Sequence, residues 1–473
     1  MSKEKSENLL NVDIEPMETE DSKDEKEFKE QKKKYLLKGF SSIVSCILHT
    51  CGYYSVFNLG HTVVYLISFR RHYNPNLTFS HGYFLFPIMY LTLSFTITVG
   101  GIIEKKIGGK KTIFLSSLIL CLSFLVMYFS RNLFLDYILM SFIGFGIALG
   151  IKLSKRNACS YFMNRKALIS GIVTLFPSLI NAWLAIFYEK VILNPLSESP
   201  TIDKTYYDER IFLNFQRLII FEIFFLILVC VLSLLTFFKN DPKETIKFGF
   251  GEQIKENKNT EKKNTNENED KKKSMIKKAL YSQRTVKLFL MIFLLFPTIN
   301  FITNTWRPIG IYYKIKTNYL QLIGALYSVT GSVSSIVFSL IGDKTKFKYI
   351  FCLFGILLTV TSFTFPISFS KDRLFVFDIL IIAFTLNGFN IIIDPHLMKV
   401  YGMENFVEIC GVIRSSSGIA EICSVILAFY LENYFTGSKD YAYRCMYLIS
   451  GFSGLISFVL GLFETDDKFD YNS

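Results

Sequence analysis

The chain has 473 residues, a net charge of +12 and a hydrophobic fraction of 51%, including 48 Phe and 26 Tyr. A soluble protein of this length would divide into two or three domains, but this chain has continuous apolar runs of about 20 residues. The runs 113–129 and 218–238 are long enough to cross roughly 30 Å of hydrocarbon, which excludes a soluble protein. The basic residues lie in short loops and one central segment, not on a soluble module with interleaved aromatic residues, which excludes nucleic-acid binding.

The apolar spans fall into two equal groups. A charged tail (1–36) has no apolar stretch typical of a cleavable signal peptide. Six spans then fill 37–238, a Lys/Asn/Glu-rich segment occupies 239–284, and six more spans fill 285–464 before an acidic tail (465–473). Because the central segment is too polar to bury a core, we expect a flexible linker there. The sequence predicts an all-α membrane protein with 12 transmembrane helices in two six-helix bundles.

The spans can be placed from their hydropathy. In chain order they are 37–69, 83–103, 113–129, 133–153, 168–188, 218–238, 286–306, 320–341, 349–369, 374–398, 409–430 and 443–463. The fourth span is followed by a basic inner loop, 152–167. An even number of spans puts both termini on one side, and the lysines before the first span and in the linker place that side in the cytoplasm. The pattern fits the plasma membrane or an organelle membrane equally well.

No sequence feature indicates an enzyme, a metal site or a cofactor. Most of the nine cysteines fall within the spans, where they act as small apolar residues. No Cys/His cluster has ligand spacing, and the GxxxxGK[ST] motif of ATP-driven pumps is absent. We therefore expect no cofactor and no catalytic group.

Two groups of six spans with a long linker resemble the major facilitator superfamily. Members carry a G-x-x-x-D-R-x-G-x-R-R signature between spans 2 and 3, and here 101–111 reads GIIEKKIGGKK, with a reduced copy at 342–344. The acid stands one position early, and Lys105 occupies its usual place. The resemblance implies a gating loop made by Gly101, Glu104, Gly108, Lys110 and Lys111.

Two further stretches are similar to the monocarboxylate transporter and oxalate/formate antiporter groups. Residues 144–173 follow their glycine-rich span 4 and the entry to span 5, and 401–421 follow their loop and span 11. In these groups a basic residue of span 11 helps to hold the substrate carboxylate, which implies this role for Arg414. The second basic residue expected on span 8 is absent from this chain.

Polar residues within the spans are the candidate substrate ligands, since spans 1, 4, 7 and 10 of this fold are expected to line a central cavity. A polar group in the bilayer is costly and tends to face protein or water. The candidates are Arg414, His49, Tyr53, Asn58, Asn300, Asn304, Asn387 and Asn390. Hydrogen bonding between helices is the alternative role for each of them.

Three residues are candidates for proton coupling. Glu421 follows Arg414 by about two helical turns, so the two share a face of span 11 roughly 10 Å apart. His49 lies within span 1 and has an unperturbed pKa near 6.5. Asp394 lies near the inner end of span 10, where a gate and a solvated helix end are equally consistent with the sequence. Structural pairing is the alternative for all three.

These features together predict a secondary active transporter that moves a small organic anion, similar to a monocarboxylate, by alternating access. Its expected partners are a small-molecule substrate, the lipid bilayer and protons, with the chain a monomer that binds no nucleic acid. A carrier of a neutral or cationic metabolite is an alternative, because Glu421 and Asp394 lie as deep as Arg414. A non-transporting sensor with the same fold is another.

Overall fold

The protein is described by a computed structural model, and every secondary-structure element in its described residues is helical. The described residues are 20–57, 59–77, 79–82, 84–188, 214–248, 278–313, 315, 317–369, 371–435, 439–465 and 467. Eleven helical segments among them are long and apolar enough to cross a membrane. The remaining predicted span, 37–69, corresponds to the second half of α1 and most of α2, which flank residue 58, outside the described part. The predicted fold class is confirmed.

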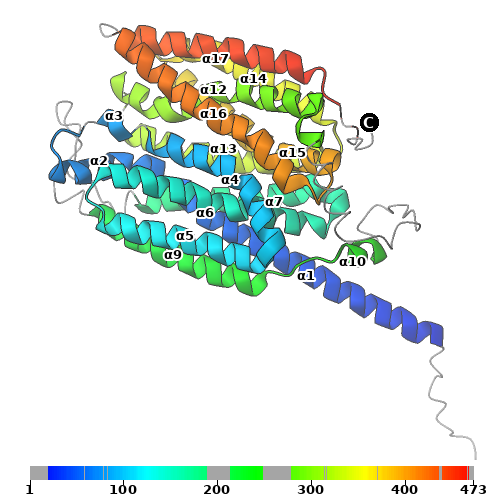
Figure 1. Ribbon diagram of the computed structural model, residues 1–473. Helices are drawn as coiled ribbons and strands as arrows, with labels where there is room; N and C mark the ends of the chain where they lie inside the picture. Colours follow the sequence, from blue (N-terminus) through cyan, green and yellow to red (C-terminus); the bar gives the residue numbers. More distant parts are fainter. Residues whose placement is uncertain are drawn as a thin grey trace, which may run out of the picture.

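The helices form two bundles, drawn one above the other in Figure 1. The first half contains α1 (Glu20–Phe57), α2 (Leu59–Tyr73), α3 (Phe79–Gly82), α4 (Leu85–Ile107), α5 (Gly109–Phe129), α6 (Leu133–Ser160), α7 (Lys166–Phe187) and α9 (Asn214–Thr236), followed by the short α10 (Pro242–Lys247). The second half contains α12 (Gln283–Tyr312), α13 (Thr317–Gly342), α14 (Phe347–Ser368), α15 (Asp372–Tyr401), α16 (Phe406–Tyr434) and α17 (Lys439–Gly461).

The outward faces of the bundles are apolar. Phe129, Phe224 and Leu235 each leave more than two thirds of the side chain exposed, on α5 and α9. Such contiguous apolar surface is unfavourable in water but suits lipid. The chain is therefore a multi-pass integral membrane protein.

Two pairs of helices hold the bundles together: α4 packs against α16, and α7 packs against α13. Glycines permit both close approaches, because a Cβ atom on Gly411 of α16 would lie 2.2 Å from Thr98 Oγ1 of α4. A Cβ atom on Gly171 of α7 would likewise lie 2.2 Å from Ser339 Cβ of α13. Small residues at such positions allow close backbone approach between helices in lipid.

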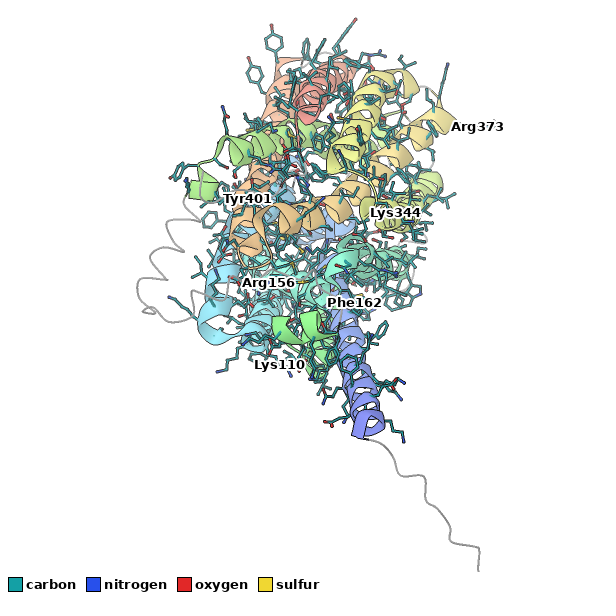
Figure 2. All side chains as sticks on the ribbon, turned by 90° about the vertical axis from the view of Figure 1, so that its right-hand side faces the viewer. Lys110, Arg156, Phe162, Lys344, Arg373 and Tyr401 are labelled. Carbon is teal, nitrogen blue, oxygen red and sulfur yellow. The ribbon has the colours of Figure 1, made fainter. Side chains whose placement is uncertain are left out.

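The start of α1, the helix α10 and the end of α17 lie at the same end of the bundles, which we call the terminal face (Figure 1). Figure 2 looks onto this face, with Arg156 and Phe162 of the first half below Lys344 and Tyr401 of the second. The beginning of the predicted linker is folded here rather than extended. Phe248 packs against Tyr35 of α1, with ring centroids 5.2 Å apart.

The end of the second bundle is anchored on the terminal face by Glu464, whose side chain is fully buried. Its carboxylate lies 3.0 Å from Arg284 Nε and 2.8 Å from Lys287 Nζ, both on the first turns of α12. His396 Nε2 of α15 lies 3.7 Å from the same carboxylate. The segment after α17 is thereby tied to the helix that begins the second half.

Candidate functional site

A buried cluster of charged side chains joins the two bundles around Asp394 of α15. The carboxylate is fully buried and accepts hydrogen bonds from Lys152 Nζ at 2.9 and 2.8 Å and from Lys155 Nζ at 2.8 Å. Arg414 Nη2 of α16 approaches it at 3.4 Å. Both lysines belong to α6 of the first bundle, so the Asp394 cluster (Lys152, Lys155, Asp394 and Arg414) is made by both halves of the chain.

The helix geometry explains how these side chains meet. Lys152 and Lys155 are three residues apart and share one face of α6. They lie roughly 8–12 Å from the end of that helix at the terminal face. Asp394 lies at a similar depth from the end of α15, and Arg414 from the start of α16. The four groups therefore lie at about the same depth below the terminal face.

Arg414 makes further contacts that fix its position. Its Nη1 donates to Asn390 Oδ1 at 2.7 Å, and the guanidinium carbon lies 5.3 Å from the Phe389 ring centroid. Its Nε is buried and has no hydrogen-bond acceptor among the described residues. Lys155 also donates to the backbone oxygen of Asn390, at 3.3 Å. The structure thus brings three of the sequence candidates, Arg414, Asn390 and Asp394, into one site.

The formal charges of the cluster are unequal, with three cations and one anion. Two other ion pairs with a buried member, Arg70–Asp136 within the first half and Lys105–Glu408 between the halves, are one-to-one. Burying an uncompensated charge is strongly unfavourable. The cluster is therefore suited to attract a further anion.

His49 and Tyr53 lie together in the first bundle but make their contacts away from Asp394. The Tyr53 hydroxyl lies 2.5 Å from His49 Nε2 and 2.9 Å from Ser116 Oγ, which donates to the backbone oxygen of Gly146 at 2.6 Å. His49 Nδ1 lies 3.5 Å from Ser154 Oγ. The two side chains link α1 to α5 and α6 through a buried hydrogen-bonded chain.

The asparagine candidates other than Asn390 do not join the cluster in the described contacts. Asn387 Nδ2 donates to the Ala383 backbone oxygen at 3.0 Å, and its amide faces Gly331 of α13. Asn300 of α12 is buried, with Nδ2 lacking a partner among the described residues. Asn58 and the side chain of Asn304 lie outside the described residues. Glu421 is buried on α16, on the side of Arg414 away from the terminal face.

The predicted gating loop contacts both bundles at the terminal face. Glu104 Oε2 accepts from Arg156 Nη2 of α6 at 2.6 Å, within the first bundle. A Cβ on Gly101 would lie 3.0 Å from Val407 at the start of α16. Gly108 caps α4 with a φ of +86°, a conformation that side chains other than glycine rarely adopt. Lys110 Nζ lies 5.7 Å from the Phe238 ring centroid, and Lys111 is exposed.

The displaced acid of this loop has a structural consequence. Lys105, which stands in the usual place of the acid, pairs with Glu408 in the first turn of α16. In the second half the corresponding loop keeps its acid. Asp343 accepts hydrogen bonds from the backbone nitrogens of Ala167 and Leu168, at 2.9 and 3.1 Å, at the start of α7. The end of α4 therefore contacts the other bundle through a cation, Lys105, whereas the loop after α13 does so through an anion, Asp343.

Sequence reasoning missed Lys152 and Lys155 as site residues. We expected the fourth span to end at 153 and assigned both lysines to the basic inner loop 152–167, but α6 continues to Ser160 and both are buried. The signal that could have found them is the i, i+3 spacing of two lysines directly after the glycine-rich apolar run. The resemblance to monocarboxylate transporters led us to expect a second basic residue on span 8. In this chain the additional basic residues lie on span 4 instead.

Helices of this length and apolar composition, arranged in two bundles that a charged cluster joins, define a polytopic membrane fold. The fold is that of the major facilitator superfamily, and residues 211–420, less than half of the chain, match the family model described as Major Facilitator Superfamily. No curated protein matches the sequence of the chain.

Solved structures resemble about nine tenths of the chain at low sequence identity. The human organic anion transporter MFSD10 (TETRAN) is similar with a TM-score of 0.63 and 10% identity, over 90% of this chain and 99% of that one. The proton:xylose symporter XylE, bound to 6-bromo-6-deoxy-D-glucose, gives 0.59 and 10%, over 90% and 94%. A variant of the E. coli fucose:proton symporter FucP gives 0.58 and 13%, over 89% and 98%.

Proposed function

We propose that the chain is a secondary active transporter that moves a small organic anion across a membrane by alternating access. The observation that carries the proposal is the Asp394 cluster, in which the excess of positive charge is buried between two bundles. A charged group held at the bundle interface of such a fold is the expected place for a substrate. The major facilitator fold supports transport, and the sign of the charge supports an anion.

Arg414 is the proposed principal ligand of the substrate carboxylate. It has a buried donor, Nε, with no acceptor among the described residues, and Asn390 orients its guanidinium. Planar guanidinium groups bind carboxylates through paired hydrogen bonds. Lys152 and Lys155 contact Asp394 from the opposite bundle, and they close the site from that side.

Alternating access requires the two bundles to part at one face and then at the other. The bonds from Asp394 to the α6 lysines cross this boundary, as do the pairs Lys105–Glu408 and Asp343–Ala167. We propose that these contacts hold the terminal face closed and that this face is cytoplasmic. A substrate anion that takes over lysine donors from Asp394 would weaken the closure.

Proton coupling is proposed at Glu421, with His49 and Asp394 as the other candidates. Glu421 lies on the same face of α16 as Arg414, about 10 Å from it along the axis. His49 is buried in a hydrogen-bonded chain within the first bundle, and Asp394 is the counter-ion of the three cations. Protonation of Glu421 would change the charge about 10 Å from Arg414 without breaking the ion pairs that hold Asp394.

The test is uptake of a panel of labelled organic anions, sugars and amino acids by liposomes containing the purified full chain. We expect anion uptake in the wild type and its loss in Arg414→Ala, with normal insertion. Arg444→Ala is the matched control, because Arg444 forms a surface ion pair with Asp440 on the same helix, α17. Uptake of a cation or a neutral solute alone overturns the anion assignment. Binding without flux identifies a sensor instead.

A further inference from the structure

The number of charges in the Asp394 cluster indicates the charge of the ligand that it would bind. Three cations surround one carboxylate, so the four side chains sum formally to +2. Lys152 and Lys155 both bond to Oδ2 of Asp394, at 2.8 Å each, which brings two like charges close together. Coulomb repulsion between such neighbours is large where water is excluded. One carboxylate cannot balance this group.

No other acid in the described residues completes the balance. Glu104 and Glu408 are each paired with another cation, Arg156 of α6 and Lys105 of α4. Glu421 lies about 10 Å from Arg414 along the axis of α16, and the ion-pair partner of Arg414 among the described residues is Asp394. The excess charge therefore remains within the Asp394 cluster.

The donors of the cluster are also incompletely used. Lys152 Nζ bonds only to Asp394 among the described residues, although an ammonium group has three N–H donors. Lys155 Nζ bonds to Asp394 and to the Asn390 backbone, and Arg414 Nε has no acceptor in the described part of the chain. At least one donor on each cation is thus available for a ligand.

Accessibility is confined to the cations. The side chains of Lys152 and Lys155 are each 10% accessible and that of Arg414 is 9%, whereas Asp394 has none. A ligand that approaches the cluster therefore meets positive groups first. Asp394 stays behind them as a fixed internal anion.

We propose that the Asp394 cluster binds a small dianion, a dicarboxylate or a phosphate monoester, in preference to a monocarboxylate. Two negative charges neutralise the formal excess of +2, and their oxygens match the free donors of the two lysines and Arg414. The inference rests on the proposed function in taking this cluster as the substrate site. It replaces the monocarboxylate class implied by the subgroup resemblance.

The test compares ligands of one size and different charge. The purified full chain is titrated at pH 8 with succinate, monomethyl succinate and dimethyl succinate, and thermal stabilisation is measured. A second series compares methyl phosphate, a dianion at this pH, with dimethyl phosphate, and separates phosphate from carboxylate chemistry. In at least one series we expect the dianion to bind about tenfold or more tightly than the monoanion, since each added charge gains an ion pair.

Variants of the cluster test whether its charge sets the preference. Lys155→Gln lowers the formal charge to +1 and should remove most of the advantage of the dianion while affecting the monoanion less. Lys152→Gln makes the same change if the first variant does not fold, and Lys348→Gln, on α14 away from the cluster, should leave the preference unchanged. An equal loss for both ligands in a folded Lys155 variant contradicts the inference.

The outcomes separate this inference from the proposed function. The dianion assignment is overturned if the wild type binds monoanions as tightly as dianions, or if it binds no dianion in either series. In that case anion flux in liposomes would still support the transport proposal. Charge-dependent binding of a dianion without flux of any tested anion leaves the ligand class in place and overturns transport.

Discussion

Lys105 at the end of α4 and Glu408 in the first turn of α16 form an ion pair across the boundary between the two bundles. On the other side of the molecule the acid Asp343 holds the start of α7 through two backbone nitrogens. A carboxylate near a helix N-terminus is favoured by the helix dipole, whereas a lysine there is not. Glu408 therefore supplies the negative charge from within α16, and Lys105 is the partner that this arrangement requires.

Exchanging the two charges should restore the contact that each single reversal breaks. We expect Lys105→Glu and Glu408→Lys to lower the stability of the detergent-solubilised protein, and the double exchange to recover part of the loss. Lys105 is half exposed, so the coupling should be roughly 0.2–1 kcal/mol. A double-mutant cycle of melting temperatures measures it. A double variant no more stable than the sum of the singles rules out a direct pair.

Glycine replacement should distinguish the tight bundle contacts from ordinary positions. Gly171→Ala would place a Cβ 2.2 Å from Ser339 Cβ and 2.8 Å from a backbone oxygen of α13. We expect a loss of about 1–3 kcal/mol, because backbone neighbours cannot move aside freely. The matched control is Gly324→Ala, where the nearest atom would lie 3.9 Å away. Thermal unfolding of both variants checks the difference, and equal melting temperatures would contradict the close packing of α7 on α13.

Acid should weaken the anchor at Glu464. Burial alone would raise the pKa of this carboxyl group, but contacts from His396 and Lys287 and the charge of Arg284 outweigh burial and lower the pKa from 4.5 to about 2. The folded pKa lies below the unfolded value, so the stability from the carboxylate is present above pH 4.5 and is lost as pH falls towards 2.

The measurement for this anchor compares the wild type with Glu464→Gln. The advantage of the wild type at pH 6 should shrink by on the order of 2 kcal/mol at pH 3. Glu27→Gln, an exposed change on α1, is the control for general acid effects. A wild-type advantage that is constant between pH 6 and pH 3 would mean that Glu464 does not titrate within the anchor.

Glu421 should set the pH dependence of uptake if it couples protons to transport. We expect Glu421→Gln to flatten the ratio of uptake at pH 5.5 and pH 7.5 while leaving the protein folded, because an amide cannot exchange a proton in this range. Glu222→Gln is the matched control, since Glu222 is buried on α9 against the Tyr188 hydroxyl. A ratio flattened by His49→Gln and not by Glu421→Gln would move the coupling site to α1.

Much of the architecture could be predicted from hydropathy, because a span of about 20 apolar residues is a strong signal. Arg414, Asp394 and Asn390 were recognisable as candidates since polar groups in apolar spans are rare and costly. Lys152 and Lys155 were not, because a lysine close to a span boundary has the same local pattern whether it enters water or turns inward. Their partner on α15 is distant in sequence, and one sequence alone does not contain that pairing.

The separation of the Asp394 cluster along the chain has a consequence for biosynthesis. Asp394 follows Lys155 by 239 residues, so a ribosome completes both lysines and the whole first bundle long before the carboxylate exists. Until α15 is inserted, the two ammonium groups of the newly made α6 lack the carboxylate with which they pair in the folded chain. We therefore expect this part of α6 to stay hydrated when the first half is inserted into the membrane. The two lysines would become buried only after the second half is inserted.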